Sequence, residues 1–91
     1  MTDPSIRELI CDMGYEDAIV FDNPDYDKAI VGISDDGRVV YDYYAMIECL
    51  METDGMSYEE AIDFISYNTI RAADYIENGP IVMYKIDRED M

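Results

Sequence analysis

The fold of this chain is decided by the stretch Ala29-Ile30-Val31-Gly32-Ile33-Ser34-Asp35-Asp36-Gly37-Arg38-Val39-Val40-Tyr41-Asp42. Two runs rich in β-branched and aromatic residues flank the four residues 34–37. Gly37 can take the positive φ that a tight turn between two strands requires. The stretch therefore predicts a β-hairpin with strands at residues 29–33 and 38–41.

The residues before the hairpin predict one helix and one further strand. Asp3-Pro4 is typical of a helix start, because it places an N-cap before a proline at the first helical position. Apolar residues then recur at helical spacing as far as Gly14. Residues 18–21 are a short apolar run of strand-forming residues, and residues 22–27 form a turn-rich acidic loop.

The residues after the hairpin predict two helices and a last strand. Asp42 can cap a helix that ends at Asp54-Gly55. Ser57-Tyr58-Glu59-Glu60 matches a capping box, which begins a helix running to about residue 77. Residues 81–86 have the composition of a strand. The order α-β-β-β-α-α-β predicts a single α+β domain over residues 1–91, with a mostly antiparallel sheet of three or four strands and helices packed on one face.

The charge of the chain is strongly one-sided. Twenty-two acidic residues oppose six basic ones, which gives a formal net charge of -16. A small domain is soluble at a net charge of magnitude roughly 2–8. The excess projects a negative potential that attracts cationic partners. Because 49% of the residues are apolar, the chain can bury enough surface to fold.

Several function classes are disfavoured by what the sequence lacks. Without histidine, the commonest general base and transition-metal ligand are missing. No apolar run approaches the ~18 residues that a membrane span needs, and the amino terminus lacks the positive start of a signal peptide. Cys11 and Cys49 are expected to be reduced, buried thiols. We expect a cytoplasmic, non-enzymatic protein without a cofactor, although a carboxylate pair could in principle hydrolyse a glycoside.

The acidic residues gather in a loop, at the hairpin tip and in helical pairs spaced i,i+4. Like-charge pairs at that spacing disfavour a helix by about 0.2–0.5 kcal/mol. Carboxylates two residues apart on an extended segment are separated by ~6.6–6.8 Å, and successive charges on one strand of a duplex rise ~3.4 Å along its axis. Carboxylates at these spacings can present a phosphate-like row to a basic groove. The alternative is plain solvation, including adaptation to high salt. The candidate charge contacts are Asp22, Asp25, Asp27, Asp35, Asp36, Glu48, Glu52, Glu59 and Asp63.

Nine tyrosines are the second unusual feature, because tryptophan is absent and tyrosine supplies most of the aromatic mass. On predicted strands, Tyr41 and Tyr84 are expected in the core. Tyr26 in the acidic loop and Tyr58 in a first helical turn are expected to be partly exposed. Tyrosine among carboxylates suits a protein interface, so Tyr26 and Tyr58 are candidate anchors for a partner.

The loop at residues 22–27 also offers oxygen ligands suited to calcium or magnesium. An EF-hand loop counted from Asp22 requires glycine at its sixth position and glutamate at its twelfth. Those positions hold Asp27 and Ile33, so the pattern fails. We therefore expect no specific metal site.

Four segments of the chain carry a resemblance to known proteins. They are residues 30–42 (IVGISDDGRVVYD), 54–62 (DGMSYEEAI), 67–72 (YNTIRA) and 79–84 (GPIVMY). Over about two thirds of its length, the chain resembles a group of small, acidic, uncharacterised bacterial and phage-associated proteins. In size and charge it is also similar to phage-encoded inhibitors of host defence nucleases, many of which are acidic DNA mimics. The resemblance implies no catalytic residues.

These observations favour a binding protein. The expected partner is the basic surface of a nucleic-acid-binding protein, with no direct contact to nucleic acid or membrane. The alternative is a small assembly module that forms homo-oligomers through an apolar or tyrosine-rich patch.

Overall fold

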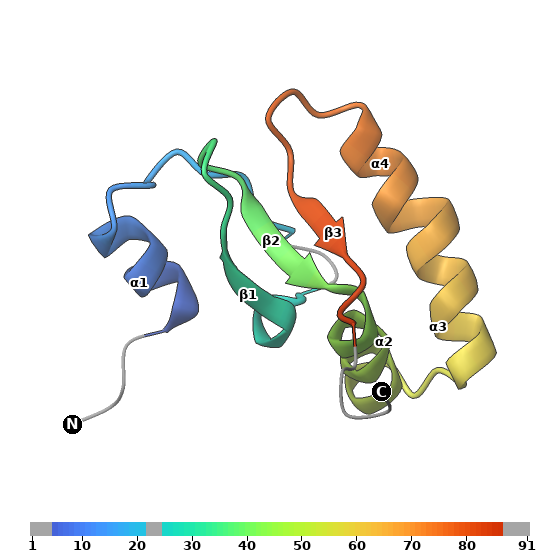
Figure 1. Ribbon diagram of the computed structural model, residues 1–91. Coiled ribbons are helices and arrows are strands. Elements are labelled where there is room, and N and C mark those ends of the chain that lie inside the picture. The colour runs from blue at the N-terminus through green and yellow to red at the C-terminus, as the bar shows by residue number, and fades with distance from the viewer. Residues whose placement is uncertain (1–4, 22–24, 87–91) are drawn as a thin grey trace.

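The computed structural model describes residues 5–21 and 25–86 (Figure 1). The elements follow the order α1 (Ile6–Asp12), η1 (Asp27–Ala29), β1 (Ile30–Ile33), β2 (Val39–Asp42), α2 (Tyr43–Thr53), α3 (Tyr58–Phe64), η2 (Ile65–Ile70), α4 (Arg71–Asp74) and β3 (Ile81–Met83). The segment η1 is a 3₁₀ turn. The segment η2 is π-helical and joins α3 to α4, so these three elements form one long helix (Figure 1).

The sheet confirms the α+β class and differs from the prediction in how its strands pair. Within the described residues it has three strands in the order β1-β2-β3. β1 and β2 are antiparallel, as the hairpin predicts. β3 pairs in parallel with β2, so the sheet is mixed rather than mostly antiparallel. The long connection through α2 and the long helix makes this pairing geometrically accessible.

The strand predicted at residues 18–21 is wrong. Those residues lie outside the sheet, where the backbone groups of Phe21 bond side chains and the Ala18 amide donates to the Tyr15 carbonyl at 3.1 Å. The Phe21 amide donates to the Tyr41 hydroxyl at 2.9 Å, and the Phe21 carbonyl accepts from Arg7 Nη2 at 3.2 Å. With these groups satisfied, the segment has no need of a ladder.

The hairpin forms as predicted, with one irregularity. The Ser34 amide donates to the Arg38 carbonyl at 2.8 Å, and Gly37 has a φ of 84°. The register shifts between Ile30 and Gly32, which leaves Val31 as an extra, exposed residue on β1. Such a bulge twists the edge strand and interrupts its pairing.

Helix caps account for where the helices begin. The Ser57 side chain accepts from the Glu60 amide and Glu60 reaches back, which confirms the capping box. Asp42 caps α2. Ser5 caps α1 by accepting from Glu8, while the predicted cap Asp3-Pro4 lies outside the described residues. The long helix ends at Asp74, slightly before the predicted end.

The core lies on one face of the central strand. Val39 and Tyr41 of β2 are fully buried, whereas Val40 and Asp42 are partly exposed. Residues from the helices and from η1 complete one cluster, namely Ile10, Ala29, Met46, Ile47, Cys49, Leu50, Ala61 and Ile65. The burial of Tyr41 is therefore confirmed.

Tyr26 belongs to this core, and the prediction that it is a partly exposed anchor is wrong. Its exposed fraction is 0%. Its ring meets Phe21 and Tyr41 edge-to-face at centroid distances of 5.8 and 6.4 Å. Its hydroxyl forms a buried hydrogen bond with Thr69 at 2.9 Å. A tyrosine whose hydroxyl has a partner can be buried as a large apolar group, which loop composition does not reveal.

We expect Tyr26→Phe to lower the free energy of unfolding at neutral pH by about 1–2 kcal/mol, because it leaves the Thr69 hydroxyl unpaired. Burial raises the pKa of the Tyr26 phenol above 10.0. The stability that the neutral phenol contributes is therefore complete below pH 10.0 and is lost as the pH rises through the folded-state pKa. Tyr26→Phe should lose less stability in alkali than the wild type.

Urea unfolding followed by circular dichroism, at neutral and at strongly alkaline pH, measures both effects. Tyr75→Phe is the matched control, because Tyr75 is 85% exposed. Equal alkaline losses in all three proteins would contradict the role assigned to Tyr26.

Candidate functional site

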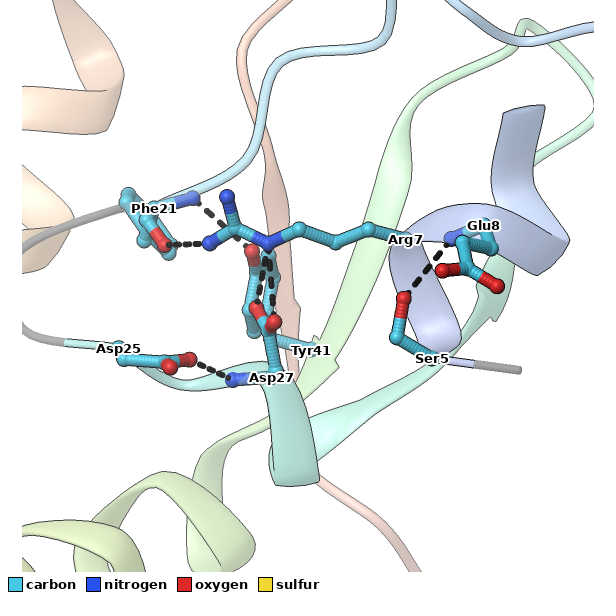
Figure 2. Close-up of polar contacts among 7 residues, drawn as sticks. All are labelled: Ser5, Arg7, Glu8, Phe21, Asp25, Asp27 and Tyr41. Atoms are coloured by element: carbon cyan, nitrogen blue, oxygen red, sulfur yellow. Dashed lines mark hydrogen bonds and ion pairs between the residues drawn. The ribbon is translucent and has the colours of Figure 1, made fainter. Parts of the chain in front are cut away.

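The acidic loop is fixed to α1 by an ion pair. Figure 2 shows the Arg7 side chain extending from α1 to Asp27, where Nε lies 2.8 Å from Oδ2 and 3.1 Å from Oδ1. Two residues earlier in the chain, the Asp25 carboxylate accepts a hydrogen bond through Oδ1 from the Asp27 amide at 2.8 Å. The Asp27 carboxylate thus has an internal partner, and its first role is structural. Asp25 keeps an exposed side chain.

The structure brings two of the predicted acidic clusters onto one surface. The 3₁₀ turn η1 packs against α2. Between them lies a groove of about 230 Å³, called here the α2–η1 groove, lined by Asp25, Asp27, Lys28, Cys49, Glu52 and Thr53. The predicted contact Glu48 is exposed on α2, one turn before Glu52. Loop and helix acids that are distant in sequence therefore form one anionic site.

The Cys49 thiol lines this groove, and the charged groups nearby affect its pKa. Its side chain is 6% exposed. Burial raises the pKa of Cys49, and the charges of Glu52, Asp25 and Glu48 raise it further, while the Lys28 ammonium acts in the opposite direction. The acids therefore outnumber the cation around the thiol. An unreactive, protonated thiol is the expected state.

The hairpin tip carries a second, separate acidic cluster. Asp35 and Asp36 are exposed there, and Asp36 bonds the Ser34 hydroxyl. Asp36 lines a hollow of about 320 Å³ together with Asp17 and Glu77. In Figure 1 the tip and α2 lie at opposite ends of the sheet. The predicted acids of the hairpin tip are therefore separated from those of the α2–η1 groove, and the two clusters do not form one continuous row.

The remaining predicted contacts lie on α3 or outside the described residues. Glu59 and Asp63 are exposed one turn apart on α3. Tyr58 is 52% exposed in the first turn of that helix, as predicted. Asp22 lies outside the described residues.

Three tyrosines form a surface cluster that sequence reasoning missed. Tyr43 and Tyr44 begin α2, and Tyr84 follows β3. Their ring centroids lie 4.6 Å (Tyr43–Tyr84), 5.6 Å (Tyr43–Tyr44) and 6.5 Å (Tyr44–Tyr84) apart. Tyr84 is 59% exposed, so its predicted core position is wrong. The cluster depends on the parallel pairing of β3, which local sequence does not encode.

Tyr43 is the most enclosed member of this tyrosine patch, defined as Tyr43, Tyr44 and Tyr84. Burial raises the pKa of Tyr43, and the neighbouring phenols of Tyr84 and Tyr58 raise it further, while the side-chain hydroxyl of Ser66 opposes the rise. Tyr58 therefore borders the patch from α3. Both the patch and the α2–η1 groove involve α2, and the exposed Glu48 lies one helical turn after Tyr44.

The described residues offer neither a metal-ion site nor a membrane-spanning helix. No group of three or more acidic, cysteine or histidine side chains there could hold a metal ion. No helix in residues 5–21 or 25–86 combines the length and apolar character needed to cross a bilayer. Cys11 is exposed and Cys49 is buried, and both thiols are free. The predicted burial of Cys11 is therefore wrong, because it lies on the outer face of α1.

Comparison of the chain with models of protein families, with curated proteins and with solved structures gave no match. The resemblance to small acidic phage-associated proteins stays a prediction.

In a Cys11→Ser background, we expect Glu52→Lys to speed the alkylation of Cys49 several-fold, because a cation beside the thiol lowers its pKa and increases the reactive thiolate. Iodoacetamide labelling followed by mass spectrometry gives the rate. Glu59→Lys has the same net charge and changes an acid on another helix. Equal rates in the two variants would show that Glu52 does not face the thiol.

Proposed function

We propose that this chain is a non-enzymatic cytoplasmic binding protein that occupies the basic surface of a nucleic-acid-binding protein. It acts there as an inhibitor or modulator, as a phage-encoded anti-defence protein would. The partner's lysines and arginines meet carboxylates in place of phosphates. The chain itself binds neither nucleic acid nor membrane.

One observation carries this proposal. The packing of η1 on α2 brings Asp25 and Glu52 into one groove, with Glu48 exposed one turn before Glu52, in a chain with a net charge of -16. Bringing these acids together raises the electrostatic repulsion between them. A surface whose acids serve only for solvation could avoid this repulsion by spreading the acids apart. Arg7 pairs with Asp27 from α1, and the exposed Lys28 is the one cation among the residues that line the groove. A rigid anionic surface is what steers association with a cationic partner.

We expect Asp25→Lys/Glu52→Lys to abolish capture of nucleic-acid-binding proteins from a bacterial lysate, because it reverses charge at the groove. The immobilised chain is incubated with nuclease-treated lysate at about 0.1 M and at 1 M salt. Exposed charges attract a partner at the lower salt concentration and are screened at the higher one. Bound proteins are identified by mass spectrometry. Capture by the wild type at the lower salt alone is the expected result.

Asp35→Lys/Asp36→Lys is the matched control at the hairpin tip. Each acid-to-lysine change adds two charge units, so both double variants have a net charge of -12. If the control variant loses capture as fully as the groove variant, total charge governs binding and the groove assignment fails. If the wild type captures no nucleic-acid-binding protein, the proposed function fails.

The tyrosine patch favours a second candidate function, a homo-oligomeric assembly module. Tyr44 and Tyr84 are 48% and 59% exposed, and they lie in a cluster instead of being scattered. Exposed clustered aromatic residues are typical of protein interfaces.

Light scattering at rising salt separates the two candidates. An assembly module becomes more associated as salt screens the repulsion between copies. The proposed binding protein stays monomeric from low to high salt, which is the result we expect. A salt-induced dimer that Tyr84→Ala abolishes would favour the assembly module.

A further inference from the structure

The tyrosine patch has a geometry that hydrophobic burial does not explain. Tyr43 and Tyr84 pack with tilted rings, and Tyr44 meets both rings near the perpendicular, at 82° and 75°. Tyr43 is the least exposed of the three and packs against both other rings, while Tyr44 and Tyr84 remain about half exposed. Two clustered tyrosines, Tyr44 and Tyr84, are thus accessible at the surface while their rings pack against Tyr43.

The backbone keeps this arrangement rigid. Asp42 Oδ1 accepts from the Tyr44 amide at 3.0 Å, which fixes the first turn of α2. Tyr84 directly follows β3, whose last residue, Met83, pairs with Asp42 of β2. The rings therefore belong to two elements that the sheet holds in register. A surface organised before binding loses less entropy when a partner arrives.

Anionic groups lie beside the aromatic faces. The Asp42 carboxylate caps the turn that carries Tyr43 and Tyr44. The Glu48 carboxylate is exposed on the same side of α2 as Tyr44, one turn further along. Aromatic faces attract cations, and the attraction is strongest for the planar guanidinium, which can stack on a ring while its edge donates to a carboxylate.

We propose that Tyr44 and Tyr84, supported by Tyr43, form a stacking platform for arginine side chains of the cationic partner. This inference rests on the proposed function and names the part of the partner that is recognised. Charge complementarity selects this occupant. A second copy would bring another -16 charges to the contact, and a nucleic acid would bring phosphates.

Two synthetic peptides test the platform. They have equal length and equal charge, and one carries arginine where the other carries lysine. Calorimetry at low salt should show that the wild type binds the arginine peptide about 4- to 25-fold more tightly, since each of the two exposed rings contributes roughly 2- to 5-fold. Tyr44→Leu/Tyr84→Leu keeps apolar area and removes the aromatic faces. This double variant should bind the arginine peptide only as tightly as it binds the lysine peptide. The affinity for the lysine peptide should change by less than about 2-fold between the wild type and the variant.

Tyr75→Leu is the control, because Tyr75 is exposed and lies on the far end of the long helix outside the patch. It should leave both affinities unchanged. If the double variant does not fold, proton NMR of the arginine peptide bound to the wild type tests the platform instead. Ring currents from stacked tyrosines should shift the proton resonances next to the guanidinium of the arginine peptide upfield.

The outcomes distinguish this inference from the function on which it rests. Equal, salt-sensitive binding of both peptides, unchanged in the double variant, would overturn the platform and leave the acidic binding function standing. Failure of both peptides to bind would overturn both. A change of oligomeric state in the double variant alone would identify the patch as a contact between copies and overturn the platform.

Discussion

The hydrogen bond between the Tyr26 hydroxyl and Thr69 joins residues 43 positions apart in the sequence, and the acidic surface depends on it. The Tyr26 ring lies among Phe21, Tyr41 and the long helix, so it fixes the loop that carries Asp25 and Asp27. The Arg7–Asp27 ion pair holds the same loop from the side of α1 (Figure 2). Together with the packing of η1 on α2, these two contacts set the position of Asp25 and Asp27 relative to α2. The acids Asp25 and Asp27 are therefore attached to the apolar core through Tyr26.

The net charge of -16 is a constraint on the fold, and the structure places the acids of the hairpin tip and those of the α2–η1 groove at opposite ends of the sheet. Repulsion between clusters falls with distance and is screened within about a Debye length, roughly 10 Å at 0.1 M salt. Separation therefore lets each cluster remain dense at a smaller cost. The end that contains α2 differs from the hairpin tip in also presenting clustered tyrosines, and this combination of apolar faces with carboxylates makes it the better candidate for recognition.

The elements that could be predicted have local causes. Gly37 permits the hairpin turn, Ser57 and Glu60 cap each other, and Asp42 caps α2, each within a few residues. The errors concern tertiary contacts. Tyr26 is buried because Thr69 is available to its hydroxyl. Residues 18–21 have strand composition, yet Arg7 and the Tyr41 hydroxyl satisfy Phe21 instead. The α2–η1 groove and the tyrosine patch each join segments distant in sequence, so composition could indicate their residue types without indicating which of them meet.

The position of β3 also sets an order of assembly. β1 and β2 are joined by a tight turn and can pair within microseconds, on the order of 1–10 μs for a hairpin. β3 reaches β2 only after the whole segment between them has closed, which brings a larger loss of chain entropy. Until then the second edge of β2 offers unpaired amides and carbonyls to any other strand. Partly folded copies of this chain repel one another strongly, so the same charge that attracts a partner also protects that open edge while the chain folds.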